Sequence, residues 1–167
     1  MKSLNETILT RDLSNNTALK DSKHIMNLLE ILDKIENLIK PDKIRKRIDS
    51  KPLFGSDKCR ITAIYKFDED RYAEKKEYVK VLREVKKIFE SYFKNDPSVQ
   101  IELSINSRFD DYGVRASFGK GNGSIALFAE KVAYAGTEVR TAFLLYAFIP
   151  SRMLSSFESS AKGFEMV

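Results

Sequence analysis

The sequence YVKVLREVKKIFESYFKNDPSVQIELSIN (residues 78–106) decides the fold class, because its hydrophobic period changes at one point. Up to residue 93 the apolar residues recur every three or four positions, which predicts the buried face of a helix. The sequence Asn95-Asp96-Pro97 ends that helix, since the residue before a proline avoids the helical conformation. Beyond Pro97 apolar and polar residues alternate, which predicts half-buried strands. The chain is therefore expected to have an α+β fold.

Working outward from Pro97, the alternation predicts four strands at residues 99–106, 114–118, 124–134 and 141–148. The segments between them are short and contain glycine, in two of the three together with aspartate or asparagine, which is typical of hairpins and implies antiparallel pairing. A β-rich stretch at residues 60–67 predicts one more strand. We expect a strongly bent, mostly antiparallel sheet or an open β-barrel, backed by two long helices.

The first long helix is predicted from Asp21 or Ser22, either of which can cap it, to Pro41. Its apolar residues recur three and four positions apart and are Ile25, Leu28, Leu29, Leu32, Ile35, Leu38 and Ile39. Residues 1–20 have scattered apolar positions and predict a flexible arm, and the basic residues 42–51 predict a short helix. The serine-rich residues 151–167 predict a linker, which leaves residues 21–150 as the domain.

The net charge of +5 makes an anionic partner plausible. Residues 1–97 hold 22 Lys and Arg against 17 Asp and Glu, whereas residues 98–167 hold 7 of each. Cys59 and His24 are the only residues of their types, which argues against a disulfide or a zinc site and favours the cytoplasm. The longest apolar run, residues 142–149, is far shorter than the ~20 residues that span a bilayer. We predict no cofactor, no metal and no membrane contact.

The turn Ser117-Phe118-Gly119-Lys120-Gly121-Asn122 follows a predicted strand and is the first place to look for function. Glycine lets the backbone approach a partner closely, while Lys120 offers a cation and Asn122 both donates and accepts hydrogen bonds. A glycine-rich hairpin that only needs positive φ is the alternative interpretation. The turn is not a phosphate-binding P-loop, because the pattern Gly-x-x-x-x-Gly-Lys-Ser/Thr is missing.

These residues resemble the N-terminal DNA-binding domain of McrB-like and LlaJI-type restriction endonuclease subunits. The resemblance covers roughly residues 78–157, and residues 125–129 and 143–146 stand where the family has its next two apolar segments. McrB-like members flip methylated cytosine into an aromatic pocket, but this chain has Lys120 between the turn glycines and has no tryptophan. The resemblance is therefore nearer to the LlaJI-type relatives, which look like site-specific readers of duplex DNA.

The resemblance implies a duplex DNA-binding specificity module of a bacterial restriction system. In this chain it implies no catalytic residue. The parent protein would be oligomeric through a GTPase motor outside this chain and a nuclease subunit. The side chains expected to read bases are Lys120, Asn122, Ser117 and Arg115, and those expected on the DNA backbone are Arg108, Arg140, Lys43, Arg45, Lys46 and Arg47. Base flipping with aromatics from elsewhere, such as Tyr112, Tyr134 or Phe118, stays open.

Two alternatives come from other functional classes. A protein-interaction module, either an adaptor or an immunity protein, would present a sheet face to a protein partner. A magnesium-dependent nuclease would use carboxylates such as Asp110 and Asp111. The nuclease is the weaker alternative for two reasons. Such an enzyme needs a lysine two residues after a strand carboxylate, on the same face, whereas Glu130 and Lys131 are adjacent and point to opposite faces of their strand. The two aspartates are explained as turn formers.

Overall fold

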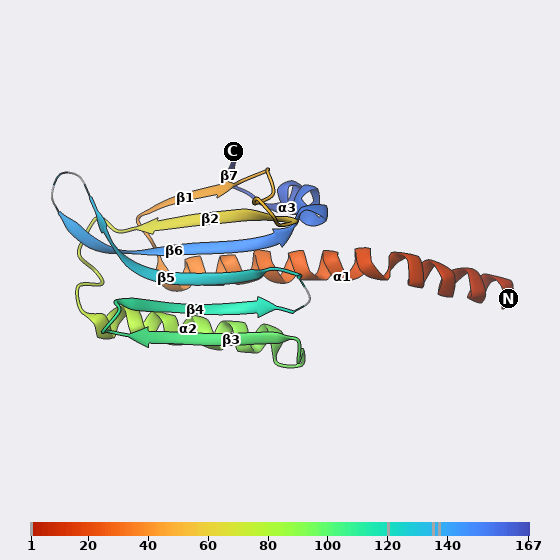
Figure 1. The fold of residues 1–167 in the computed structure, drawn as a ribbon, viewed down its shortest axis with the longest axis horizontal. Helices are drawn as coiled ribbons and strands as arrows, with labels where there is room; N and C mark the ends of the chain where they lie inside the picture. The colour runs from red at the N-terminus through yellow and green to blue at the C-terminus, as the bar shows by residue number, and fades with distance from the viewer. Residues whose placement is uncertain (1, 120, 135, 137) are drawn as a thin grey trace.

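The computed structural model describes the backbone of residues 2–119, 121–134, 136 and 138–167, and the side chains from residue 17 onward within these ranges. The described residues form three α-helices, one 3₁₀-helix and seven strands (Figure 1). In chain order they are α1 (Lys2–Ile39), β1 (Lys43–Ile48), β2 (Lys58–Lys66), α2 (Lys75–Phe93), β3 (Val99–Asn106), β4 (Asp111–Phe118), β5 (Ser124–Ala133), β6 (Val139–Pro150), η1 (Ser151–Met153), α3 (Leu154–Ser160) and β7 (Phe164–Met166).

The described strands form one sheet in the order β3-β4-β5-β6-β2-β1-β7. All neighbours are antiparallel except β1 and β7, which run parallel. The end strands β3 and β7 do not pair with each other, so the sheet is open. The α+β class and the open sheet are thus confirmed. The expectation of two long helices is not confirmed as stated, because the described residues form three α-helices, of 38, 19 and 7 residues.

The core lies between one face of the sheet and the helices α1 and α2, which run behind the strands in Figure 1. On β6 alternate residues such as Phe143, Leu145 and Ile149 point into it and are fully buried. They meet the stripes of α1 and α2, which include Ile35 and Phe89. Burying such a side chain contributes roughly 1.5–3 kcal/mol, so this helix-covered face supplies most of the stability.

The basic segment is a strand, and the prediction of a helix at residues 42–51 is wrong. β1 pairs along its whole length with β2, so that Ile48 lies opposite Ile61 in the core. Without β1, the backbone groups on one edge of β2 would have no strand partner. This long-range pairing outweighs the local preference of a basic sequence for helix.

The two ends of the chain also differ from expectation. Helix α1 begins at Lys2, so the backbone of residues 2–20 is helical and does not form an irregular arm. Residues 151–167 do not form a linker, because Met153 and Phe157 are 2% and 0% exposed and β7 adds to the sheet beside β1. The serine-rich segment therefore contains two core residues, Met153 and Phe157. Among the described residues, no helix is long and apolar enough to span a membrane.

Candidate functional site

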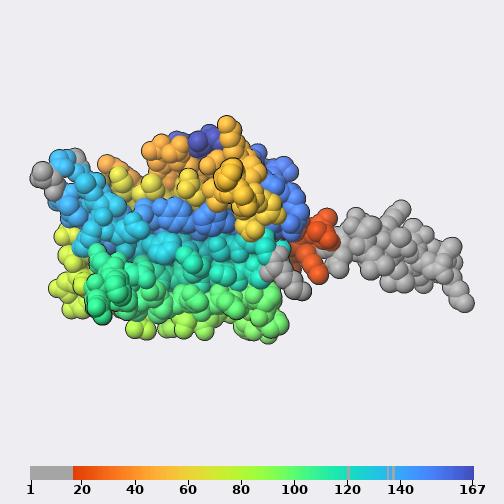
Figure 2. Space-filling view, in the orientation of Figure 1, coloured from red at the N-terminus to blue at the C-terminus, as the bar shows by residue number. Residues whose placement is uncertain are grey.

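The face of the sheet that α1 and α2 leave uncovered is the main candidate surface, and we call it the open face. Figure 2 shows strands from β3 to β2 at the surface of this face. Strand alternation assigns its residues, because the core residues occupy the other positions. Register pairs them across strands, for example Arg115 with Ala126, Ala126 with Tyr146, and Tyr146 with Thr62.

A partly exposed apolar strip runs along the middle of the open face, on β5, β6 and β2. It consists of Phe128, Leu144, Tyr146, Phe148 and Ile64. The rings of Phe128 and Tyr146 lie 6.1 Å apart between centroids at an interplanar angle of 57°. Contiguous apolar surface of this kind is a candidate for contact with a partner.

Arginines lie on both sides of the apolar strip. Arg115 on β4 is exposed, and its guanidinium lies 6.0 Å from the Phe128 ring centroid. On the other side are Arg60 on β2 and Arg47 on β1. Adjacent strands are about 4.8 Å apart, so Arg115 is roughly 14 Å from the Arg60 strand and roughly 19 Å from the Arg47 strand. Glu102 lies opposite Arg115 in the register and Glu165 lies opposite Arg47, so each side also carries an acid.

The residues predicted to read bases are divided between two surfaces. Arg115 and the half-buried Ser117 lie on the open face, two positions apart on β4. Asn122 is exposed in the β4–β5 turn and lines a cleft on the helix side of the sheet. Lys120 lies outside the described residues. Phe118 and Tyr112 point into the core, so they are not available as walls of a pocket on the open face.

The residues predicted to contact the DNA backbone are also divided. Arg45 and Arg47 lie on the open face beside Arg60, and Arg45 has an ion pair of 3.9 Å with Glu165. Lys43 shares this face, and its Nζ lies 3.7 Å from Oδ1 of Asp68. Arg108 is exposed in the β3–β4 turn against Phe109. These residues remain accessible to an anionic partner.

Lys46 and Arg140 are engaged within the protein, contrary to their predicted role. Lys46 points to the helix-covered face, where its Nζ lies 2.7 Å from a carboxylate oxygen of Glu36. Arg140 pairs with Glu138 at 2.6 Å, and its guanidinium donates to the carbonyl oxygens of Phe67 and Asp68. Hydrogen bonds to Glu138 raise the pKa of Arg140 further. Both cations stabilise the fold locally.

The glycines of the β4–β5 turn have structural reasons of their own. Gly121 and Gly123 have φ of 74° and 103°, which side-chain-bearing residues rarely adopt. A Cβ on Gly123 would run into the backbone carbonyl of Phe148, and a Cβ on Gly119 would lie 2.9 Å from the carbonyl oxygen of Ser98. The structural interpretation of the glycine pattern is therefore sufficient for these positions.

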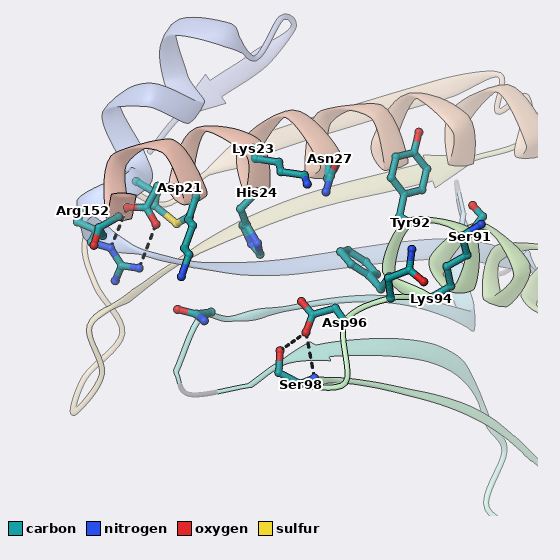
Figure 3. A pocket seen from close by; sticks show the side chains of 16 residues that line it. Asp21, Lys23, His24, Asn27, Ser91, Tyr92, Lys94, Asp96, Ser98 and Arg152 are labelled. Carbon is teal, nitrogen blue, oxygen red and sulfur yellow. Dashed lines mark hydrogen bonds and ion pairs between the residues drawn. The ribbon is translucent and has the colours of Figure 1, made fainter. Parts of the chain in front are cut away.

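A cleft on the other side of the sheet, which we call the α1 cleft, lies between α1, the end of α2 and the β4–β5 turn (Figure 3). Its volume is about 720 Å³. His24 projects from α1 into it, and its ring meets the Phe118 ring edge-on with centroids 4.5 Å apart. Burial lowers the pKa of His24, while Asp21 and Asp96 raise it and Arg152 lowers it.

The sequence interpretation missed the apolar strip, Arg60 and the α1 cleft. The signal for the strip was present, because Leu144, Tyr146 and Phe148 share one face of a strand by period two. What the pattern did not show is which face the helices cover. No signal at the level of sequence brings Asn122 next to α1.

In comparisons with known proteins, no protein-family model, no curated protein and no solved structure matches this chain.

Proposed function

We propose that this chain is a DNA-binding module without catalysis of its own, and that it holds duplex DNA on the open face of its sheet. The observation that carries the proposal is the apolar strip between two arginine-bearing sides. Arginine is suited to phosphate because its planar guanidinium donates two hydrogen bonds at once. Aromatic and aliphatic side chains between the arginines suit the sugar walls and base edges of a groove.

The spacing across the sheet favours a duplex over a single strand. The major groove of B-DNA is about 12 Å wide, and its two phosphate chains lie on either side. Arg115 is separated from Arg60 and Arg47 by roughly 14–19 Å of sheet, which lets the two sides meet different strands of one duplex. β-sheet readers of duplex DNA use strands in a groove in this way. A single strand has one phosphate chain and would need arginines on only one side of the apolar strip.

The finer proposal is a specificity module of a bacterial McrB-like or LlaJI-type restriction protein that acts in the cytoplasm. It is supported by the turn and strand order that the chain shares with that family. In this version the bent sheet backed by α1 and α2 is the reading surface, with Arg115 and Ser117 facing the bases. The GTPase motor and the nuclease subunit would be supplied outside this chain.

The proposal is tested by fluorescence anisotropy with a labelled duplex pool and a single strand of equal length, at about 50 and about 200 mM salt. We expect tighter binding of the duplex and an affinity that falls steeply with salt. Cytosine-methylated and unmodified duplexes separate base flipping from site-specific reading. For variants that remove an arginine of the open face, a matched control is Lys80→Gln, which removes an exposed positive charge on α2, away from that face. Absence of duplex binding at the lower salt concentration would refute the proposal.

A second candidate function is a protein-interaction module, and exposed apolar loop residues favour it. Phe54 in the β1–β2 loop is fully exposed, and Phe109 in the β3–β4 turn is 70% exposed. Such side chains serve as anchors in protein interfaces. Duplex binding discriminates the candidates: the DNA-binding proposal expects it, unchanged when both residues are replaced with serine, whereas a protein-interaction module expects none.

A further inference from the structure

The α1 cleft has the size and lining of a site for a small polar ligand. Its volume of about 720 Å³ falls within the roughly 300–1,000 Å³ of small-molecule sites. Its walls come from α1, the α2–β3 loop, the β4–β5 turn and η1, so it is built by segments far apart in the chain. Asparagines 27, 95 and 122 and serines 91 and 98 line it. These side chains offer hydrogen bonds to hydroxyl and phosphate groups.

The charges around the cleft favour an anion, because Arg152 and three lysines outnumber its two carboxylates. Asp21 accepts two hydrogen bonds from Arg152, at 3.0 and 3.2 Å. Asp96 accepts from the backbone N–H and the hydroxyl of Ser98, and these bonds hold the pKa of Asp96 below its ordinary value. Figure 3 shows both sets of bonds. Asp21 is therefore paired with a cation, whereas Asp96 stays negatively charged, because both of its partners are neutral.

Three lysines line the same cleft, namely Lys20 and Lys23 on α1 and Lys94 after α2. Within the described part of the chain none of them forms an ion pair. They are exposed and come from two elements that face each other across the hollow. An anion between α1 and Lys94 would be approached from two sides, which a flat surface patch does not provide.

His24 lines the same cleft and is incompletely satisfied. Its Nε2 is buried and has no hydrogen-bond partner among the described residues. The groups around it are Lys20, Lys23 and Asp21 on α1, Lys94 and Asp96 after α2, and Arg152 on η1. Burial disfavours the imidazolium here, and an added anion would favour it.

We propose that the α1 cleft binds a phosphate ester of a sugar, with Lys20, Lys23 and Lys94 around the phosphate and Asn27 and Asn122 bonded to sugar hydroxyls. This site is separate from the open face and does not depend on the proposed function. A free sugar phosphate and the 5′-phosphate end of a DNA strand present the same chemistry. The experiment therefore includes both sources.

The single histidine of the chain gives a direct readout. The His24 imidazole signals are followed by NMR during titration with ribose 5-phosphate, and separately with ribose at constant ionic strength. We expect a saturable shift with ribose 5-phosphate and none with ribose, and a rise in the pKa of His24 in the bound state. A duplex with 5′-phosphate ends and the same duplex without them identify the second source. Absence of a saturable shift with either phosphate ester overturns the proposal.

Charge-matched variants test which lysines are responsible. The double variant Lys23→Gln, Lys94→Gln is expected to weaken ribose 5-phosphate binding at least about tenfold, which corresponds to about 1.4 kcal/mol. The control Lys80→Gln, Lys86→Gln removes the same charge from α2 outside the cleft and should leave binding unchanged. Equal weakening in both variants overturns the proposal, because it would show attraction to net charge alone. DNA binding by the open face should be the same in both.

Discussion

The two faces of the sheet are made from the same strands but have different tasks. On β6, Phe143 and Leu145 point to α1 and α2 and are fully buried, whereas Leu144 and Tyr146, which alternate with them, point to the open face and are half-buried. Under the proposed function, successive residues of one strand therefore serve stability and contact separately. The comparison implies that neighbouring substitutions should separate unfolding from DNA binding.

The largest effect is expected at the helix-covered face. Phe143→Ala should lower the free energy of unfolding by about 3–5 kcal/mol, because it opens a cavity among buried aromatic rings. Tyr146→Ala, three positions later, should cost about 1 kcal/mol and weaken duplex binding about tenfold. Urea unfolding followed by circular dichroism, together with anisotropy, measures both. Equal losses of stability would contradict the division between the faces.

The β4–β5 turn provides the next test, because it sets the start of β5 on the sheet. Gly123→Ala and Gly55→Ala both place an alanine at positive φ, which costs about 1–2 kcal/mol. Only at Gly123 does the new Cβ meet backbone, so repacking there should add about 1–3 kcal/mol. The difference between the two midpoints of urea unfolding checks this. Similar midpoints would mean that the turn can shift away from Phe148.

Lys46 and Arg47 are adjacent on β1 and point to opposite faces, which allows a charge-matched comparison. Lys46→Gln should lower the free energy of unfolding by about 1–3 kcal/mol, since it removes the ion pair with the partly buried Glu36. Arg47→Gln should change stability by less than about 0.5 kcal/mol. Under the proposed function, it should reduce the salt dependence of duplex binding by about one unit of slope. If Arg47→Gln lowered stability and Lys46→Gln changed only the salt dependence of duplex binding, Arg47 and not Lys46 would face the helices.

The smallest effect is expected from pH at the α1 cleft. Burial lowers the pKa of His24 from its ordinary value of 6.5, so the unfolded chain binds this proton more readily. This contribution to stability is present above pH 6.5 and is lost as the pH falls through the folded-state pKa. His24→Gln should remove that part of the pH dependence in urea unfolding between pH 7.5 and about pH 5. Identical pH profiles of both proteins would exclude a contribution from His24.

Much of the β-rich half could be predicted, because its pattern is local. Period two marked β3 to β6, and the Gly and Asp residues between them marked the turns. β1 and the C-terminal segment could not be predicted in the same way. β1 is a strand because β2 and β7 accept it on either side, and Phe157 is a core residue because α3 packs against α1. These causes lie far away in the sequence.

The candidate site shows the same limit. The positions of Arg115 and Ser117 on one face follow from their spacing, and the structure places both on the open face. The engagement of Lys46 by Glu36 and of Arg140 by the carbonyls of Phe67 and Asp68 depends on contacts that no spacing reveals. A count of basic residues therefore overestimates how many cations are available to a partner.

The pairing of β2 with β6 joins residues 58–66 to residues 139–150 in the middle of the sheet. The hairpins from β3 to β6 can form early, because their loops are short, whereas β2 must wait until a much longer loop closes. A fragment limited to residues 78–157, the part that resembles restriction proteins, would leave one edge of β6 unpaired. Such an edge recruits other chains and leads to aggregation. β2, which precedes that fragment in the chain, thus protects the β-rich half against self-association, and expression fragments should keep both.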